Sequence, residues 1–256
     1  MATQTLPANR PVQFPKPANN QCVASMAGGA IHVTPSQSEQ VEVFCNVAPE
    51  DADKYIFTVD TDGTFRFQGK QKPFLFPHSS ALILLQIPPE CQLDLSSSGG
   101  SIDVGVHGAA ITAMASGGSV HIAAANTSLS VTASGGSISV DTMSGPVKAS
   151  GNGGSIHLAK IQGAADVNVS GGSADLDLLS TPAAHIRSSG GNIRVRVDRS
   201  AAFNLIADAA GGSVTILPPL VTSGMVGSHF TGKINGGGTT TVDLGASGGS
   251  IIVGPT

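Results

Sequence analysis

A four-residue phrase, Ser-Gly-Gly-Ser, returns every 18 residues through the middle of the chain. It begins at Ser98, Ser116, Ser134, Asn152 and Ser170, where asparagine once replaces the first serine. Later copies return with small offsets from this interval. A short, fixed period is typical of stacked repeat units that contact only their neighbours. The repeat therefore predicts a stack of like units rather than a globule closed on itself.

The residues between the phrases alternate between apolar and polar side chains. Ile102, Val104 and Val106 follow the first phrase at every second position, and a second alternating run begins at Ile111 and again at Leu129. Alternation with period two predicts β-strands, and the valine and isoleucine content favours them. Each unit is therefore predicted to hold two strands, which are separated by a turn and a Gly-Gly corner.

A unit this short cannot form a sheet by itself, so we predict an all-β, parallel β-solenoid with about 18 residues per coil and rungs about 4.8 Å apart. No aromatic residue occurs between Ser98 and Ala202, which fits a narrow interior filled by aliphatic side chains. Glycine permits positive φ or close backbone approach at each corner. The predicted corner glycines are Gly99, Gly100, Gly117, Gly118, Gly135, Gly136, Gly153, Gly154, Gly171, Gly172, Gly190 and Gly191.

The chain divides into an arm and one long body. Residues 1–20 contain four prolines among asparagine, glutamine and alanine, which favours a flexible, extended arm that could dock on a neighbouring copy. Residues 21–256 are predicted to form a single solenoid domain, with irregular coils in 21–95 and regular repeats and a closing coil in 96–256. Seven of the nine phenylalanines precede residue 77 and predict a bulkier core at the first end.

Composition limits the partners. No basic stripe with stacking aromatics is present, so nucleic acid is not expected, and no apolar run is long enough to span a bilayer. No secretory signal is seen, so we expect a cytoplasmic protein, with a surface or extracellular location as the alternative. Cys22, Cys45 and Cys91 have no metal-ligand spacing and are expected to be buried free thiols. No cofactor or metal is expected, and a small-molecule substrate is disfavoured.

Two passages resemble a known family. Ile87-Pro88-Pro89-Glu90-Cys91, which runs through Leu95 into Ser98-Gly99-Gly100-Ser101-Ile102, is similar to a strand, Pro-Pro, strand passage of the DUF4097 family of β-solenoids. The segment from Phe230 to Ile251 resembles the closing coil of that family. The resemblance covers about residues 21–256, implies a solenoid described loosely as adhesin-like, and brings no catalytic residues. The coil length is also similar to that of bactofilin-type filament solenoids.

Candidate chemistry is sparse. The Gly-Gly phrases lack the regular aspartates of calcium-binding repeats. The histidines His107, His121, His157 and His185 are expected to be solvated at the surface. Asp175 and Asp177 could act as paired carboxylates of a glycoside hydrolase, but the next coil offers Arg194 and Arg196 at matching positions. We therefore expect the ion pairs Asp175–Arg194 and Asp177–Arg196 and no catalytic residues.

The function expected from these patterns is structural. Ile251, Ile252 and Val253 form an apolar strand with no charged cap after it, which predicts an open end that favours self-association. We expect a non-enzymatic scaffold or self-assembling, filament-forming subunit with a copy of itself or another protein as partner. The alternative is an adhesin-like module that displays a flat face to a protein or glycan. An enzyme is the third hypothesis, with a cleft supplied by the irregular piece Leu217–Thr231.

Overall fold

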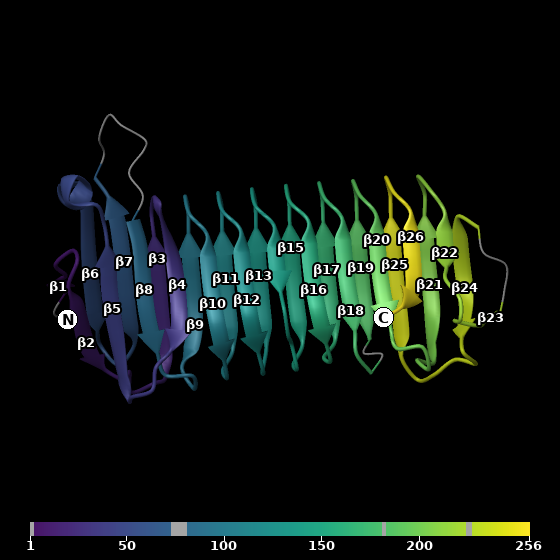
Figure 1. The fold of residues 1–256 in the computed structure, drawn as a ribbon, viewed down its shortest axis with the longest axis horizontal. Helices are drawn as coiled ribbons and strands as arrows, with labels where there is room; N and C mark the ends of the chain where they lie inside the picture. Colours follow the sequence, from purple (N-terminus) through teal and green to yellow (C-terminus); the bar gives the residue numbers. More distant parts are fainter. Residues whose placement is uncertain (1–2, 73–80, 181–182, 224–226) are drawn as a thin grey trace.

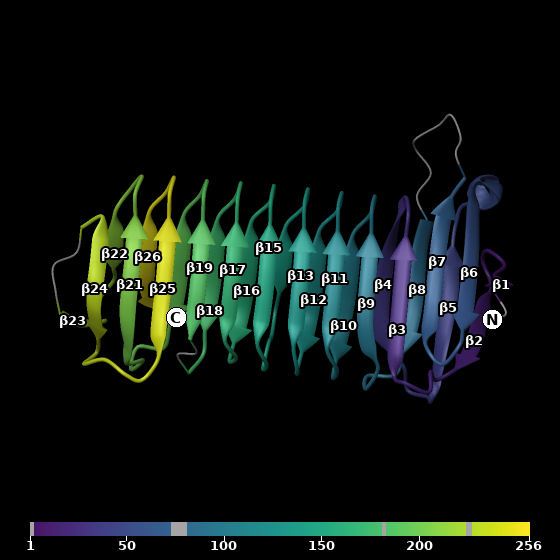
Figure 2. The same cartoon turned by 180° about the vertical axis from the view of Figure 1, so that it is seen from behind.

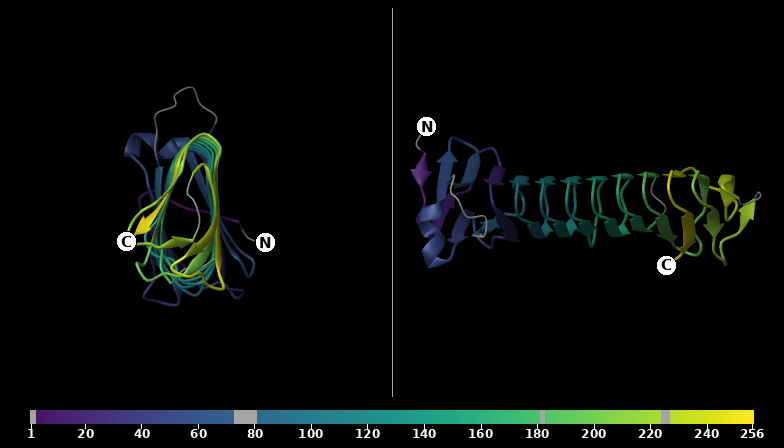
Figure 3. Two further views of the ribbon diagram at one scale, coloured as in Figure 1. Left: turned by 90° about the vertical axis from the view of Figure 1, so that its right-hand side faces the viewer. Right: turned by 90° about the horizontal axis from the view of Figure 1, so that it is seen from above.

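The computed structural model describes residues 3–72, 81–180, 183–223 and 227–256, and they form an elongated β-solenoid (Figures 1 and 2). Two sheets face each other along the whole length, and the end view shows the coils superposed as a narrow, flattened tube (Figure 3). Most neighbouring strands are parallel, so the predicted fold class is confirmed. Among the described residues no helix is long and apolar enough to cross a bilayer.

Fourteen strands form the first sheet, named sheet A here, and twelve form sheet B. In spatial order, sheet A consists of β1 (Gln4–Thr5), β6 (Tyr55–Thr61), β7 (Phe65–Gln71), β3 (Gln21–Met26), β9 (Gln92–Ser97), β11 (Ile111–Ala115), β13 (Leu129–Ala133), β15 (Val147–Gly151), β17 (Ala165–Val169), β19 (Ala184–Ser188), β25 (Thr241–Ala246), β21 (Phe203–Ala209), β24 (His229–Ile234) and β23 (Thr222–Ser223). Sheet B consists of β2 (Pro11–Pro15), β5 (Gln40–Asn46), β8 (Ala81–Ile87), β4 (Gly29–Pro35), β10 (Ile102–His107), β12 (Val120–Ala125), β14 (Ile138–Val140), β16 (Ile156–Ile161), β18 (Ala174–Leu178), β20 (Ile193–Val197), β26 (Ile251–Pro255) and β22 (Val214–Ile216). A short 3₁₀ helix, η1 (Pro49–Lys54), precedes β6.

The 18-residue period sets the register of the stack. Ile102, Val120, Ile138 and Ile156 follow one another across neighbouring strands of sheet B, and each is at most 1% exposed. Because side chains alternate between the two faces of a strand, one in-register column of aliphatic residues lines the interior while the next faces water. Burial of these columns is the main favourable contribution to folding.

The second glycine of each corner is required by close approach between coils. A Cβ on Gly136 would lie 2.5 Å from the carbonyl carbon and oxygen of Gly118 in the preceding coil. Positive φ does not explain them, because the described glycines with positive φ are Gly28, Gly63, Gly236 and Gly237. The serines beside the glycines form a ladder of hydrogen bonds: the Ser119 amide donates to Ser101 Oγ at 3.2 Å, and further corners repeat this bond.

Spatial order departs from sequence order near the C-terminus. The strands β25 and β26 form one coil, named the closing coil here, which lies between the coil β19–β20 and the coil β21–β22. Figure 1 shows that the C-terminus lies partway along the stack, at the end of β26, and not at the end of the stack. Ile251 and Val253 are fully buried, and Ile252 lies opposite Arg194 on one side and Thr215 on the other. The expectation that these residues form an open end for assembly is therefore wrong.

The N-terminal end of the stack also differs from expectation. Instead of a flexible arm, β2 pairs antiparallel with β5, and Phe14 is buried with its ring 5.6 Å from that of Phe65. Lys16 forms ion pairs with Glu39 at 3.1 Å and with Glu90. Prolines are tolerated here because an edge strand has no further partner. The segment therefore covers the first end with a bulky core, as the early phenylalanines predict, although Phe74 and Phe76 lie outside the described residues.

Candidate functional site on sheet A

The outer face of sheet A carries a hollow of about 600 Å³ that runs across β13, β15, β17, β19 and β25. We name it the axial groove because it follows the long axis of the stack. The lining residues are Ser128, Leu129, Pro146, Val147, Lys148, Ala164, Ala165, Asp166, Ala183, Ala184, His185, Thr241 and Asp243. The groove is therefore built from the same positions in successive coils.

Small residues make the groove. The floor holds Leu129, Val147, Ala165 and Ala184, whose side chains are buried and face the interior of the solenoid. Ala164 and Ala183 stand beside this floor and are exposed, so they add little height to one wall. Because these two side chains end in methyl groups, that wall is apolar and low. A chain of extended residues can lie on such a surface, and a compact ligand finds little enclosure there.

The second wall carries ionisable side chains. Lys148, Asp166, His185 and Asp243 occupy one column, since each lies opposite the next across neighbouring strands. Asp243 comes from the closing coil, 58 residues beyond His185 in sequence. Ladders of opposite charge on one sheet face stabilise the pairing of strands modestly. The same ladder gives the groove a polar edge that can bind backbone or charged groups of a partner.

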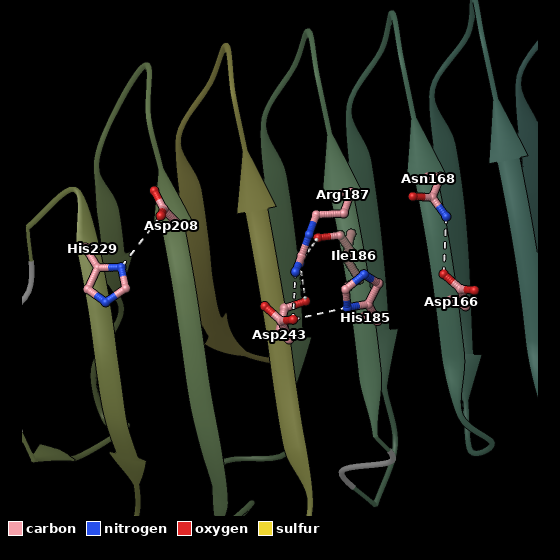
Figure 4. Close-up of polar contacts among 8 residues, drawn as sticks. All are labelled: Asp166, Asn168, His185, Ile186, Arg187, Asp208, His229 and Asp243. Atoms are coloured by element: carbon pink, nitrogen blue, oxygen red, sulfur yellow. Dashed lines mark hydrogen bonds and ion pairs between the residues drawn. The ribbon is translucent and has the colours of Figure 1, made fainter.

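Asp243 ends this wall and binds both Arg187 and His185, as Figure 4 shows. Its Oδ2 accepts from Arg187 Nη2 at 2.7 Å and from His185 Nδ1 at 3.1 Å, and its backbone carbonyl accepts from Arg187 Nη1 at 3.2 Å. The Arg187 guanidinium, with His185 as a weaker contributor, holds the pKa of the Asp243 carboxyl below its usual range. The carboxylate is therefore ionised and already paired.

A glycine makes the Arg187 geometry possible. Gly245 lies opposite Arg187 in β25, and a Cβ there would stand 2.9 Å from Arg187 Cδ. The arginine side chain therefore lies over Gly245 and reaches back to Asp243. A second hollow of about 580 Å³ begins beyond this pair and includes Asp208 and His229, whose ion pair is 3.8 Å long. Asp243 and Arg187 thus separate two hollows on one face.

The predicted carboxylate–arginine pairs lie on sheet B, on the other side of the stack. Asp175 lies opposite Arg194 and Asp177 opposite Arg196, as the period predicts. The expected Asp177–Arg196 ion pair forms, but Asp175 pairs with Arg196 instead of Arg194. Arg196 therefore binds both aspartates and lies 2.7 Å from Asp175 Oδ1. Arg194 forms no ion pair with the described residues. Both carboxylates are thus engaged by one guanidinium, which does not suit the acid and base roles of a hydrolase.

The histidines divide into two groups. His121, His157 and His185 lie at the surface as expected, and His121 bridges Asp103 and Asp141, with both distances at 3.2 Å. Carboxylates only accept hydrogen bonds, so both ring nitrogens of His121 carry protons in this arrangement. Partial burial lowers the pKa of His121, but its bonds to the two aspartates outweigh burial and raise it.

The expectation for His107 is wrong, because this histidine is 1% exposed and its Nε2 donates to the Cys91 carbonyl at 2.6 Å. Burial lowers the pKa of its imidazole. The cause is local: the alternation of β10 ends at Val106, which is 57% exposed, so the following side chain faces inward. Across the described residues no group of three or more histidine, cysteine or acidic side chains can hold a metal ion.

The sequence pattern does not identify Asp243 as part of a site. The period aligns Lys148, Asp166 and His185 once the one-residue offset is applied, and that alignment is the signal that finds the first half of the wall. The local sequence does not place Asp243 beside these residues. Alternation within a coil specifies which of its residues face outward, but it does not specify which coils become its neighbours in the stack.

The fold and the site together define a β-solenoid with a grooved sheet face. The family model of the Toastrack DUF4097 domain matches residues 23–253, so the chain belongs to this family. No curated protein matches the chain. A crystal structure of a "putative cell adhesion protein" from Clostridium sporogenes aligns with 96% of this chain and 100% of its own, at 10% identity and a TM-score of 0.32. A likeness this low carries no functional argument.

Proposed function

We propose that this protein is a non-enzymatic, rigid scaffold that binds a protein partner through the axial groove of sheet A. The observation that carries the proposal is the continuity of the groove over five strands, with exposed alanines along one wall and ionisable side chains along the other. An extended peptide segment suits this shape, because its side chains can lie against the methyl groups of Ala164 and Ala183 while its polar groups meet the wall that holds Lys148. The groove lining contains no aromatic residue, which disfavours a glycan.

Free thiols support the expected compartment. Cys22, Cys45 and Cys91 are buried and unpaired, which fits a reducing cytoplasm. We therefore propose a cytoplasmic location, with a surface location as the alternative.

A photo-activated cross-linking residue placed at position 164 tests the proposal, because Ala164 is exposed and lines the groove. The matched control carries the same residue at Ala123, which is half-buried and faces outward on sheet B. The proposal predicts an adduct with one defined protein at position 164, its loss when Ala183→Arg fills the groove, and no such adduct at position 123. Equal labelling at both positions, or persistence with Ala183→Arg, would refute the groove as the binding surface.

The second candidate is self-assembly into end-to-end scaffolds. It is favoured by Leu217 and Val221, which are 42% and 66% exposed on the outermost coil at the C-terminal end. Light scattering after size-exclusion chromatography separates the candidates. A monomer at high concentration supports the binding scaffold, whereas open-ended growth that Val221→Asp abolishes supports stacking.

A further inference from the structure

The closing coil fills a slot within the stack, near the end that holds β21 and β22. The strand β25 pairs with β19 and β21, and β26 pairs with β20 and β22, all in parallel register. The chain passes from β20 to β21 through residues 198–202 and skips the width of one coil, and the closing coil occupies that width in the finished stack. Without that coil, four strand edges would present unpaired backbone groups.

The closing coil contacts the slot mainly through aliphatic side chains that face the interior of the solenoid. Val242, Leu244, Ala246, Ile251 and Val253 are each at most 3% exposed. They continue the aliphatic columns of the coils on both sides, and their backbone groups complete both ladders. Side-chain columns, backbone edges and polar contacts such as Arg187 with Asp243 make up this interface. All of them can form equally well whether the coil and the slot belong to one chain or to two.

A glycine hinge joins the closing coil to the rest of the chain. Asn235 is fixed by its side chain, which donates to the carbonyls of Arg199 at 3.0 Å and Ala201 at 2.9 Å. The five residues after it, Gly236-Gly237-Gly238-Thr239-Thr240, are not buried, and Gly236 and Gly237 have φ of 88° and 84°. Glycine loses more conformational freedom on ordering than other residues, so this segment is a natural pivot.

We propose that the slot between β19–β20 and β21–β22 is an interaction surface for a second copy of this chain, and that two copies exchange their closing coils to form a dimer. The proposal is independent of the partner proposed for the axial groove. Exchange of an identical element preserves every native contact, so it costs little beyond association itself. A short flexible linker gives its own coil an effective concentration in the millimolar range, so the dilute protein is expected to be monomeric.

Engineered disulfides in the full-length chain test the exchange. Arg194 and Ile252 are cross-strand neighbours on sheet B, one on the slot and one on the closing coil, so Arg194→Cys with Ile252→Cys reports which chain supplies the coil. The control is Ser139→Cys with His157→Cys, also cross-strand neighbours but both outside the exchanged coil. The native cysteines are buried and do not compete. After unfolding and refolding, both variants are oxidised and compared on non-reducing gels.

Exchange predicts that the slot pair runs increasingly as a covalent dimer as the refolding concentration rises, while the control pair stays monomeric at every concentration. A slot pair that stays monomeric at all concentrations overturns the proposal. Dimers seen by light scattering without a covalent dimer of the slot pair also overturn it, because they would reveal a contact without exchange. Neither result bears on cross-linking in the axial groove.

Shortening the hinge supplies a second measurement. Ile234 and Thr241 flank β21 on opposite sides, about two strand spacings or 9.6 Å apart, with the chain at Ala202 between them. Deleting Gly236–Thr239 leaves a connection of about 10–11 Å at full extension, too short to pass around Ala202. The exchanged dimer is then expected even in dilute solution, whereas four added glycines at the same place should lower the dimer fraction. A monomeric, folded deletion variant would contradict the proposal.

Discussion

Gly136→Ala is the sharpest test of why every coil carries a Gly-Gly corner. The added Cβ would lie 2.5 Å from Gly118 carbonyl atoms, whereas ordinary contact begins at 3.4 Å, so the two coils must separate by about 0.9 Å at this corner. That displacement is about a fifth of the rung spacing. The ladder bonds beside the corner, such as Val120 N to Ser137 O at 3.0 Å, would lengthen with it.

Overpacking of this kind costs about 1–3 kcal/mol, and we expect Gly136→Ala at the upper end because backbone atoms cannot move aside. The matched control is Gly135→Ala, whose Cβ would meet the Ser116 carbonyl oxygen at 3.2 Å and its next neighbours at 3.6 Å. The control should change the free energy of unfolding little, since alanine also restricts the unfolded chain.

The assay is urea unfolding followed by far-ultraviolet circular dichroism, combined with hydrogen exchange of peptides that cover the corner. Hydrogen exchange is needed because stacked repeats can unfold locally rather than in one step. The reasoning predicts faster exchange in the coils on both sides of Gly136→Ala and native protection in Gly135→Ala. Equal stability and equal protection of the two variants would refute close approach as the reason for the second glycine.

Three further outcomes follow from buried and charged groups. Because His107 has a lowered pKa, the unfolded chain binds its proton more readily, so stability should fall as pH drops below about 6.5, and His107→Gln should flatten this part of the pH profile. Burial raises the pKa of Cys45 to about 12 and also raises those of Cys22 and Cys91, so thiol reagents should label none of them until the protein is unfolded; labelling of the native protein would contradict this. Arg196→Met should cost less than about 1 kcal/mol, and the cost should shrink in high salt; a larger, salt-independent loss would mean that packing dominates.

Much of the stack is predictable from local pattern alone. The alternation around Ile111, Leu129 and Val147 correctly predicts which side chains face inward, because a strand's two faces are set by its own sequence. The antiparallel pair β6–β7 likewise turns at Asp62-Gly63, a sequence typical of hairpins, and Gly63 has a φ of 91°. These features depend on residues that are adjacent in sequence.

The order of stacking is not predictable in the same way. Residues 251–253 carry the pattern of any other coil, and the period alone would place them after β22 rather than between β20 and β22. A column of aliphatic side chains fits many neighbours, so choice of neighbour depends on loop geometry and on the sum of contacts over the whole chain. The wall formed by His185 and Asp243 was missed for this reason.

The position of the closing coil also has a consequence for synthesis. During translation β19–β20 and β21–β22 emerge before the coil that joins them in space. The four strand edges of the slot therefore lack their native partner until residues 241–255 arrive, although the earlier coils from β9 to β20 can stack in the order of their synthesis. A ribosome-bound chain that stops before Thr241 would present those edges to any chaperone or neighbouring nascent chain in reach.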